Sequence, residues 1–214
     1  MELREIKKLI FGGENDHVEF KRKINHPEKV IREVVAFANS EGGHLIIGVD
    51  DDKSLVGLKY AEEDDYLLRK AIKELIRPAV RFDAESIALN EKRAILHFYI
   101  HAGERKPYFA FEEKHHRYGK AFVRVRDRSI QASPEIRKIL KLNNSPEATA
   151  FEYGPNEKLL FNYLHDNEKV TVNEFREMSG LDYNAASTTM IRMVLAKALR
   201  IIPREKEDWF CAVE

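Results

Sequence analysis

Apolar residues recur at helical spacing in three segments of the first half of the chain. Residues 2–11, ELREIKKLIF, carry an apolar stripe between charged positions and predict an amphipathic helix. Pro27 suits the first turn of a second helix, which runs through VIREVVAFAN to residue 39 and stops before Gly42–Gly43. A third helix is expected from about Glu62 to Ile76.

Shorter segments with the patterns of strands alternate with these helices. HVEFKR (17–22) and HLIIGVD (44–50) predict two strands, and the DDKS that follows predicts a turn. Further strands are expected in RFDAESIAL (81–89), RAILHFYIH (93–101) and KAFVRVR (120–126), before a helix that begins at Pro134. This mixed order of elements predicts an α+β fold with a mixed sheet and flanking helices.

The last 60 residues predict a second, smaller domain. EKLLFNYL suits a helix, Thr171 and Glu174 form a T-x-x-E capping box for the next, and Asp182 can cap a third. IIPREKEDWFCAV (201–213) then reads as two short strands around a charged turn. Three helices and a hairpin predict a winged helix. The segment NNSPEATAFEYGP (143–155) is interpreted as a linker, which gives domains at 1–145 and 152–214.

Composition restricts the class of protein. Of 214 residues, 43% are hydrophobic, and 36 Lys and Arg balance 36 Asp and Glu, which predicts a soluble globular protein. No apolar run is long enough to cross a bilayer, and the N-terminus does not read as a signal peptide, so no membrane partner and a cytoplasmic location are expected. The single cysteine, Cys211, excludes an internal disulfide and cysteine-rich zinc motifs.

The basic residues are concentrated between positions 114 and 141. In KAFVRVRDR, period-two alternation puts Ala121, Val123 and Val125 on one face. The other face would carry Lys120, Phe122, Arg124, Arg126 and Arg128. Cations around one aromatic ring can bind the phosphates and a base of a nucleic acid, although a solvated outer sheet face is the alternative.

The predicted third helix of the small domain has an exposed face with little positive charge. This face would present Asn184, Ser187, Thr188 and Arg192. DNA-binding domains usually carry more cations, so dimerisation or protein contact and DNA reading both stay open for this helix.

The segment GENDHVEFKRK (13–23) places two carboxylates, Glu14 and Glu19, before a basic cluster. They could be solvated, ion-paired, or ligands of a metal beside a phosphate-binding patch. On a straight strand, residues five apart point to opposite faces, so the chain must bend around Asn15–His17 if both side chains are to meet.

Several motifs in one order resemble the Schlafen AlbA domain family. They are VEFK (18–21), AFANSEGGHLIIGVDDD (36–52), GERKPYFAF (103–111) and YGKAFVRVRDRSIQASPEI (118–136), and the resemblance covers roughly residues 10–140. It implies a nucleic-acid-binding domain, of the kind described in bacteria as a transcriptional regulator and often followed by a winged helix.

The same resemblance implies a second function. In animal Schlafen proteins three carboxylates cleave transfer or ribosomal RNA with a divalent metal, and Glu14, Glu19 and Asp50 match them, with Asp51 as a substitute for Asp50. Lys21 could stabilise charge on the phosphate, and Mg²⁺ or Mn²⁺ suits carboxylate ligands. Those animal proteins have two lobes and a zinc site, whereas this chain has one lobe and no cysteines for zinc.

Three functions are therefore expected, in this order. The first is binding of DNA or RNA, with a transcriptional role, through Lys21, Arg22, Lys23, Arg117, Lys120, Phe122, Arg124, Arg126 and Arg128. The second is a metal-dependent endoribonuclease, and the third is a dimeric protein-interaction adaptor. An ATP site is not expected, because no G-x-x-x-x-G-K-[ST] motif occurs. A homodimer is expected because the hairpin carries five large apolar residues, Ile201, Ile202, Trp209, Phe210 and Val213.

Overall fold

A computed structural model describes residues 1–143 and 153–213 of the chain. The chain divides into two compact units, Met1–Gln131 and Ala132–Glu214. Among the described residues, no helix combines the length and the apolar character needed to span a bilayer.

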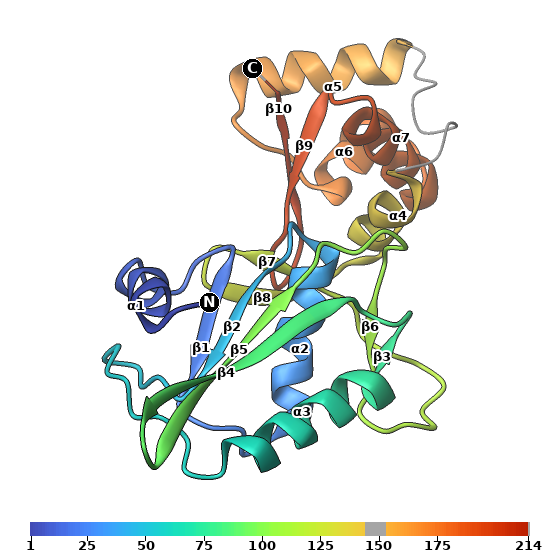
Figure 1. Cartoon of the computed structure of the whole chain (residues 1–214). Helices are drawn as coiled ribbons and strands as arrows, with labels where there is room; N and C mark the ends of the chain where they lie inside the picture. Colours follow the sequence, from blue (N-terminus) through green and yellow to red (C-terminus); the bar gives the residue numbers. More distant parts are fainter. Residues whose placement is uncertain (144–152, 214) are drawn as a thin grey trace. The chain divides into compact units, whose positions relative to one another are not determined.

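The N-terminal unit has the α+β composition that the sequence predicts (Figure 1). Its elements are α1 (Leu3–Phe11), β1 (Val18–Lys21), α2 (Pro27–Asn39), β2 (Gly43–Ile47), α3 (Ala61–Leu75), β3 (Ile76–Arg77), β4 (Phe82–Asn90), β5 (Arg93–Ile100), β6 (Phe109–Ala110), β7 (Phe122–Val125) and β8 (Arg128–Gln131). The three predicted helices and the predicted strands are confirmed. Sequence patterns missed β3, β6 and β8, of which two are only two residues long.

A mixed four-stranded sheet organises this unit. Its strand order is β1-β2-β5-β4, with β1 parallel to β2 and the other neighbours antiparallel. One face, with Leu45 and Phe98, packs with apolar residues of α2 and α3. The opposite face receives Ile6 and Ile10 of α1 against Ile46. The sheet is therefore covered by helices on both faces, as Figure 1 shows.

Helix α2 anchors the loops around it. Pro27 is its first residue, and the buried amide of Asn39 at its end donates to the backbone oxygens of Tyr108 and Phe122, each at 2.9 Å. A side chain at Gly43 would lie 2.5 Å from the ring of Phe37, so the close approach of β2 to α2 requires glycine there. These contacts bring β7 against α2.

Helix α3 separates its charges along its length. Acidic side chains, Glu62, Glu63 and Asp64, occupy its first turn, and Lys73 lies in its last turn. This arrangement complements the helix macrodipole, which favours anions at the N-terminus and cations at the C-terminus.

The C-terminal unit contains α4 (Pro134–Leu142), α5 (Pro155–Asp166), α6 (Val172–Ser179), α7 (Tyr183–Leu195), β9 (Leu199–Ile202) and β10 (Trp209–Ala212). The hydroxyl of Thr171 accepts from the N–H of Glu174, Gly180 closes α6 at φ 70°, and Asp182 caps α7, all as predicted. Strands β9 and β10 form the predicted antiparallel hairpin. The assignment of this helix order as a winged helix stays a prediction.

Helix α4 packs against α7 within the C-terminal unit. Most of the predicted linker, residues 144–152, lies outside the described residues. The predicted domain limits at 145 and 152 therefore stay predictions.

Candidate functional site

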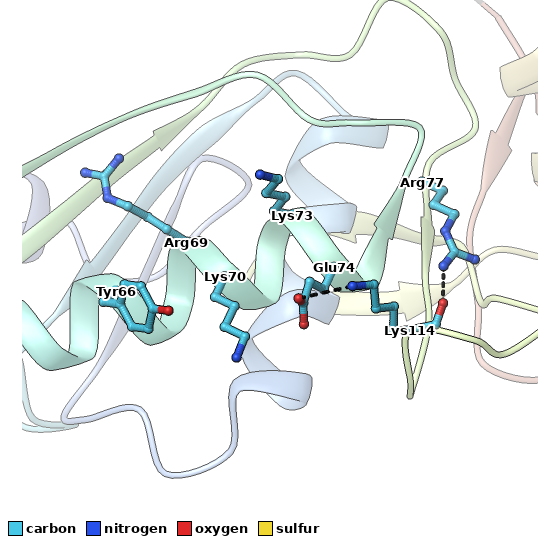
Figure 2. A pocket seen from close by; sticks show the side chains of 7 residues that line it. All are labelled: Tyr66, Arg69, Lys70, Lys73, Glu74, Arg77 and Lys114. Atoms are coloured by element: carbon cyan, nitrogen blue, oxygen red, sulfur yellow. Dashed lines mark hydrogen bonds and ion pairs between the residues drawn. The ribbon is translucent and has the colours of Figure 1, made fainter.

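The C-terminal half of α3 borders a basic hollow of about 650 Å³, which we call the α3 hollow (Figure 2). Tyr66 and Glu74 line it together with five cations, Arg69, Lys70, Lys73, Arg77 and Lys114. Arg69 is paired with Asp65 and Lys114 with Glu74, which leaves three cations in excess and gives the hollow a positive potential that attracts anions.

The two arginines of the α3 hollow are held in fixed positions. The guanidinium of Arg77 lies 4.4 Å from the ring centroid of Phe111 and donates to the backbone oxygen of Lys114. The Nε of Arg69 donates to Asp65 at 2.6 Å. Stacking and hydrogen bonding thus restrict both side chains before any ligand arrives.

Two lysines of the α3 hollow lack such partners. Lys70 and Lys73 are exposed, and neither forms an ion pair or hydrogen bond with residues 1–143 or 153–213. They point away from each other across the helix in Figure 2. The Nζ of Lys114, by contrast, lies 3.5 Å from Glu74. Two unpaired ammonium groups are therefore available to an anion.

Sequence reasoning missed this site, although part of its signal is visible. Tyr66, Lys70 and Lys73 recur at intervals of four and three, which is the spacing of one helix face, and Arg77 follows in β3. Lys114 comes from a loop far along the chain, and no sequence pattern connects it to α3.

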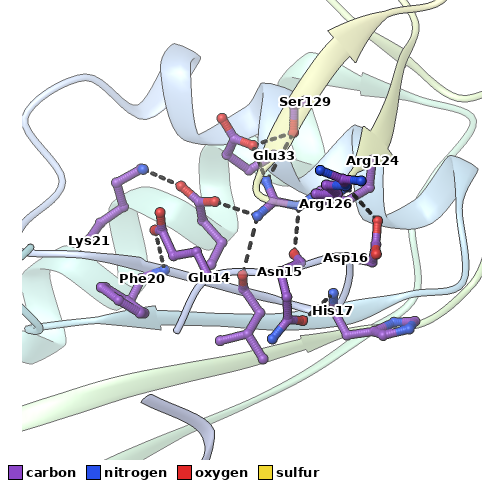
Figure 3. Close-up of polar contacts among 12 residues, drawn as sticks. Glu14, Asn15, Asp16, His17, Phe20, Lys21, Glu33, Arg124, Arg126 and Ser129 are labelled. Carbon is purple, nitrogen blue, oxygen red and sulfur yellow. Dashed lines mark hydrogen bonds and ion pairs between the residues drawn. The ribbon is translucent and has the colours of Figure 1, made fainter. Parts of the chain in front are cut away.

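Arg124 was expected on an exposed basic strand face, and this prediction is wrong. Its side chain is 1% exposed, with one terminal nitrogen 2.7 Å from Glu19 and the other 3.0 Å from Glu33 (Figure 3). Its Nε donates to the backbone oxygen of Asn15 at 3.0 Å. The physical reason is that β7 packs against α2, which covers this face and supplies Glu33.

The chain bends between the two glutamates, as the sequence required. The N–H of Asn15 donates to the backbone oxygen of Val18 at 3.0 Å, which closes a turn. Across this turn, the carboxylate of Glu14 accepts a hydrogen bond from the N–H of Phe20 at 3.1 Å (Figure 3). The bend expected between Glu14 and Glu19 is present, and the two carboxylates are near enough for the charge of Glu19 to act on Glu14.

The environment shifts two pKa values in this cluster. Burial raises the pKa of Glu14, and the neighbouring charge of Glu19 raises it further. Burial opposes the charged form of Lys21. Its hydrogen bond to Glu19 and the negative charges of Glu19, Glu14 and Glu33 together outweigh this effect, so the pKa of Lys21 is raised. Glu19 thus shares its two oxygens between Lys21 and Arg124.

The three carboxylates matched to a metal site do not form one in this arrangement. Asp50 lies 3.2 Å from a guanidinium nitrogen of Arg22, and Glu19 is already bound by two cations. No group of three or more His, Cys, Asp or Glu side chains in residues 1–143 and 153–213 is arranged to hold a metal ion. As placed, Glu19 and Asp50 are paired with cations, so the three carboxylates are not arranged around Mg²⁺ or Mn²⁺, and the metal site stays a prediction.

The remaining predicted nucleic-acid contacts lie on several elements. Phe122 was expected as an exposed ring, but it is half-buried and packs against the core of the N-terminal unit, so that prediction is wrong. Lys120 lies 3.0 Å from Glu112. The exposed cations are Arg22, Lys23, Arg117, Lys120, Arg126 and Arg128. They do not share one strand face, because β7 ends at Val125 and Arg126 adopts φ 56° in the turn that follows.

A row of rings lies on strands β2 and β5, on the sheet face that carries Ile46. His44 Nδ1 is 2.9 Å from His97 Nε2, and His97 Nδ1 is 3.1 Å from Glu85. Tyr99 packs between His44 and His101, with centroid distances of 4.9 and 5.0 Å. Burial, followed by the neighbouring His97 and His17, lowers the pKa of His44 to about 4. These rings form a packed and hydrogen-bonded row.

One residue predicted on the exposed face of α7 is buried. Ser187 is 1% exposed and donates its hydroxyl to Glu135 of α4 at 2.7 Å, so its predicted exposure is wrong. Asn184, Thr188 and Arg192 are exposed as predicted and line a hollow of about 610 Å³. Arg192 supplies the one basic side chain among the residues that line this hollow.

The hairpin offers less apolar surface than the dimer prediction assumed. Phe210 is fully buried, and Ile201 packs against the same core. Trp209 lies between Lys169 and Arg204, at 3.3 and 4.0 Å from its ring centroid. Val213 is 50% exposed. The homodimer stays a prediction, and light scattering is its test.

Comparisons with known proteins find matches to much of the chain. Residues 14–133 match the family described as Schlafen, AlbA_2. The N-terminal domain of a RecG-related protein from Nitrosomonas europaea is 21% identical, with 58% of this chain and 88% of that chain covered and a TM-score of 0.44. The DIP2311 protein from Corynebacterium diphtheriae is 19% identical, with 74% of this chain and 27% of that chain covered and a TM-score of 0.43.

Proposed function

The chain belongs to the Schlafen, AlbA_2 family, and we propose that its N-terminal unit binds nucleic acid through phosphate contacts in the α3 hollow. The observation that carries this proposal is the set of five cations around one carboxylate in a concave surface. Phosphate groups are the natural partners of such a set, and the guanidinium groups can bind their oxygens in pairs. A role in transcription, expected from the family resemblance, would build on this binding.

A purely structural reason for the cations is available for part of the set. Lys73 lies in the last turn of α3, where a positive charge stabilises the helix dipole. That reason does not extend to Lys114, which enters the hollow from a separate loop. The helix dipole also does not explain Lys70, which has no anionic partner. Because neighbouring cations repel one another, a bound anion would stabilise this group.

Salt-dependent binding tests the proposal. We expect Lys70→Ala/Lys73→Ala to lower the affinity for labelled RNA or DNA by about tenfold at low salt, because two phosphate contacts are lost. The slope of log K against log salt should become shallower by about 0.7–0.9 for each contact removed. Fluorescence anisotropy over a salt series measures both quantities.

A matched control is available on another helix of the same unit. Lys7 and Lys8 are exposed on α1, so Lys7→Ala/Lys8→Ala removes the same charge away from the α3 hollow. The proposal predicts a change below about twofold for this control. The proposal that nucleic acid binds in the α3 hollow would be refuted if both double variants lost the same affinity. It would also be refuted if the parent bound neither RNA nor DNA at low salt.

Metal-dependent RNA cleavage is the second candidate function. One feature favours it: burial, followed by the neighbouring charge of Glu19, raises the pKa of Glu14, as expected where two carboxylates lie near each other. Glu19 and Asp50 would first have to leave Arg124 and Arg22. We expect Mn²⁺ to raise the melting temperature of the parent and not of Glu14→Gln, and RNA cleavage to require Glu14. Cleavage that persists in Glu14→Gln would contradict this function.

A further inference from the structure

Tyr66 is an exposed ring at the edge of the α3 hollow. Its residue is 66% exposed, and it stands one helical turn before Lys70. Within the described residues, Tyr66 packs in none of the hydrophobic cores and its ring contacts no other ring. The tyrosine ring therefore presents a flat apolar surface to solvent next to unpaired cations (Figure 2).

We propose that the α3 hollow binds an unpaired segment of nucleic acid, with one base stacked on Tyr66 and the adjoining phosphates on Lys70, Lys73 and Arg77. This inference rests on the function proposed above and names the class of nucleic acid that the site accepts. A duplex hides the faces of its bases in the stack, whereas an unpaired strand offers them to aromatic side chains.

The shape of the site supports a strand rather than a duplex. A helix that reads the major groove must project from its protein so that it can enter the groove. Helix α3 instead borders a concave surface that the loop residue Lys114 also lines. A flexible single strand can follow such a concave surface, whereas a duplex behaves as a stiff rod over this length.

The spacing of the residues along α3 supports the same ligand. Tyr66 and Lys73 are separated by about 10 Å of helix rise. At about 3.4 Å per nucleotide in a stacked strand, this distance spans roughly three nucleotides. Lys70 and Lys73 reach to different sides of the helix axis (Figure 2), so a strand between them would contact both ammonium groups.

Binding of three labelled oligonucleotides to the full chain tests the inference. The probes are oligouridine, oligodeoxythymidine and a DNA duplex of equal length, at one fixed salt concentration. We expect Tyr66→Ala to weaken binding of both single strands by about tenfold, since stacking of one base is lost. The same substitution should change duplex binding by less than about twofold. Tyr66→Phe keeps the ring and should restore single-strand binding.

A ring substitution elsewhere provides the control. Phe11 is 85% exposed at the end of α1, so Phe11→Ala removes an exposed ring distant in sequence from the α3 hollow, and it should leave all three affinities unchanged. If Tyr66→Ala weakens single strands and duplex equally, or weakens neither, the single-strand inference is overturned. That result leaves the proposed function intact as long as Lys70→Ala/Lys73→Ala still weakens binding, so the two failures are distinguishable.

Discussion

Two groups of cations in the N-terminal unit have opposite environments. Arg124, which the strand pattern suggested for phosphate binding, is buried and pairs with Glu19 and Glu33. Lys70 and Lys73, which no motif indicated, are exposed on α3 and pair with no acidic side chain among the described residues. An arginine buried between acids inside the fold is not available to a ligand, whereas exposed cations without acidic partners are.

The strongest test of this contrast is Arg124→Ala. The substitution leaves Glu19 and Glu33 buried without their shared cation, and breaking a buried ion pair costs about 3–5 kcal/mol. We expect the free energy of unfolding to fall by about 3 kcal/mol, the lower end of this range. Lys21 still contacts Glu19, and Arg32 still contacts Glu33. Urea denaturation measures this fall.

The exposed lysines supply the other half of that test. Lys70→Ala/Lys73→Ala should change the free energy of unfolding by less than about 0.5 kcal/mol, as surface substitutions usually do. A loss below about 1 kcal/mol for Arg124→Ala would show that the buried cluster contributes little, and the contrast between the two groups would then fail.

A smaller effect is expected for Glu14→Gln, and it depends on pH. Burial and Glu19 raise the pKa of Glu14 above its usual value of 4.5, so the folded state disfavours the ionised form. The free energy of unfolding of the parent therefore falls as the pH rises from about 4.5 through the raised pKa of Glu14. Below about pH 4.5 the carboxyl is protonated in both states and has no such effect. Glutamine is neutral at every pH and keeps an oxygen for the N–H of Phe20.

The expected gain of Glu14→Gln at pH 7 is below about 1 kcal/mol, because solvent screens a half-buried carboxylate. At pH 4 the variant and the parent should unfold at the same urea concentration. A variant that is less stable than the parent at pH 7 would contradict the expected gain, and it would mean that the ionised carboxylate stabilises the fold through the N–H of Phe20.

Local patterns predicted the elements well because helix and strand periodicity depend on neighbouring residues. The Pro27 helix start and the cap at Asp182 are both confirmed. The turn between Glu14 and Glu19 followed from simple strand geometry. Strands β3 and β6 were not predicted, because two residues are too few to show the alternation of a strand.

Errors arose where a distant segment decides the environment. Alternation correctly separated Val123 from Arg124, but it could not show that α2 covers the arginine side and contributes Glu33. The predicted exposure of Ser187 was wrong for the same reason, since its hydroxyl donates to a carboxylate of α4, that of Glu135. The α3 hollow needed Lys114 from a loop about 40 residues beyond the helix, a long-range contact that periodicity does not encode.

The acidic first turn and basic end of α3 have a consequence for the kinetics of association. The chain has no net charge, so a polyanion far from it feels little attraction. At physiological salt the field of the hollow extends only about 8 Å, and the acidic turn repels phosphates that arrive at the other end of the helix. Capture would therefore depend on close and correctly placed collisions, with rate constants nearer about 10⁵–10⁶ M⁻¹s⁻¹ than the values of electrostatically steered pairs. Selectivity among nucleic acids at this helix would therefore come from differences in the dissociation rate constant and not in the association rate constant.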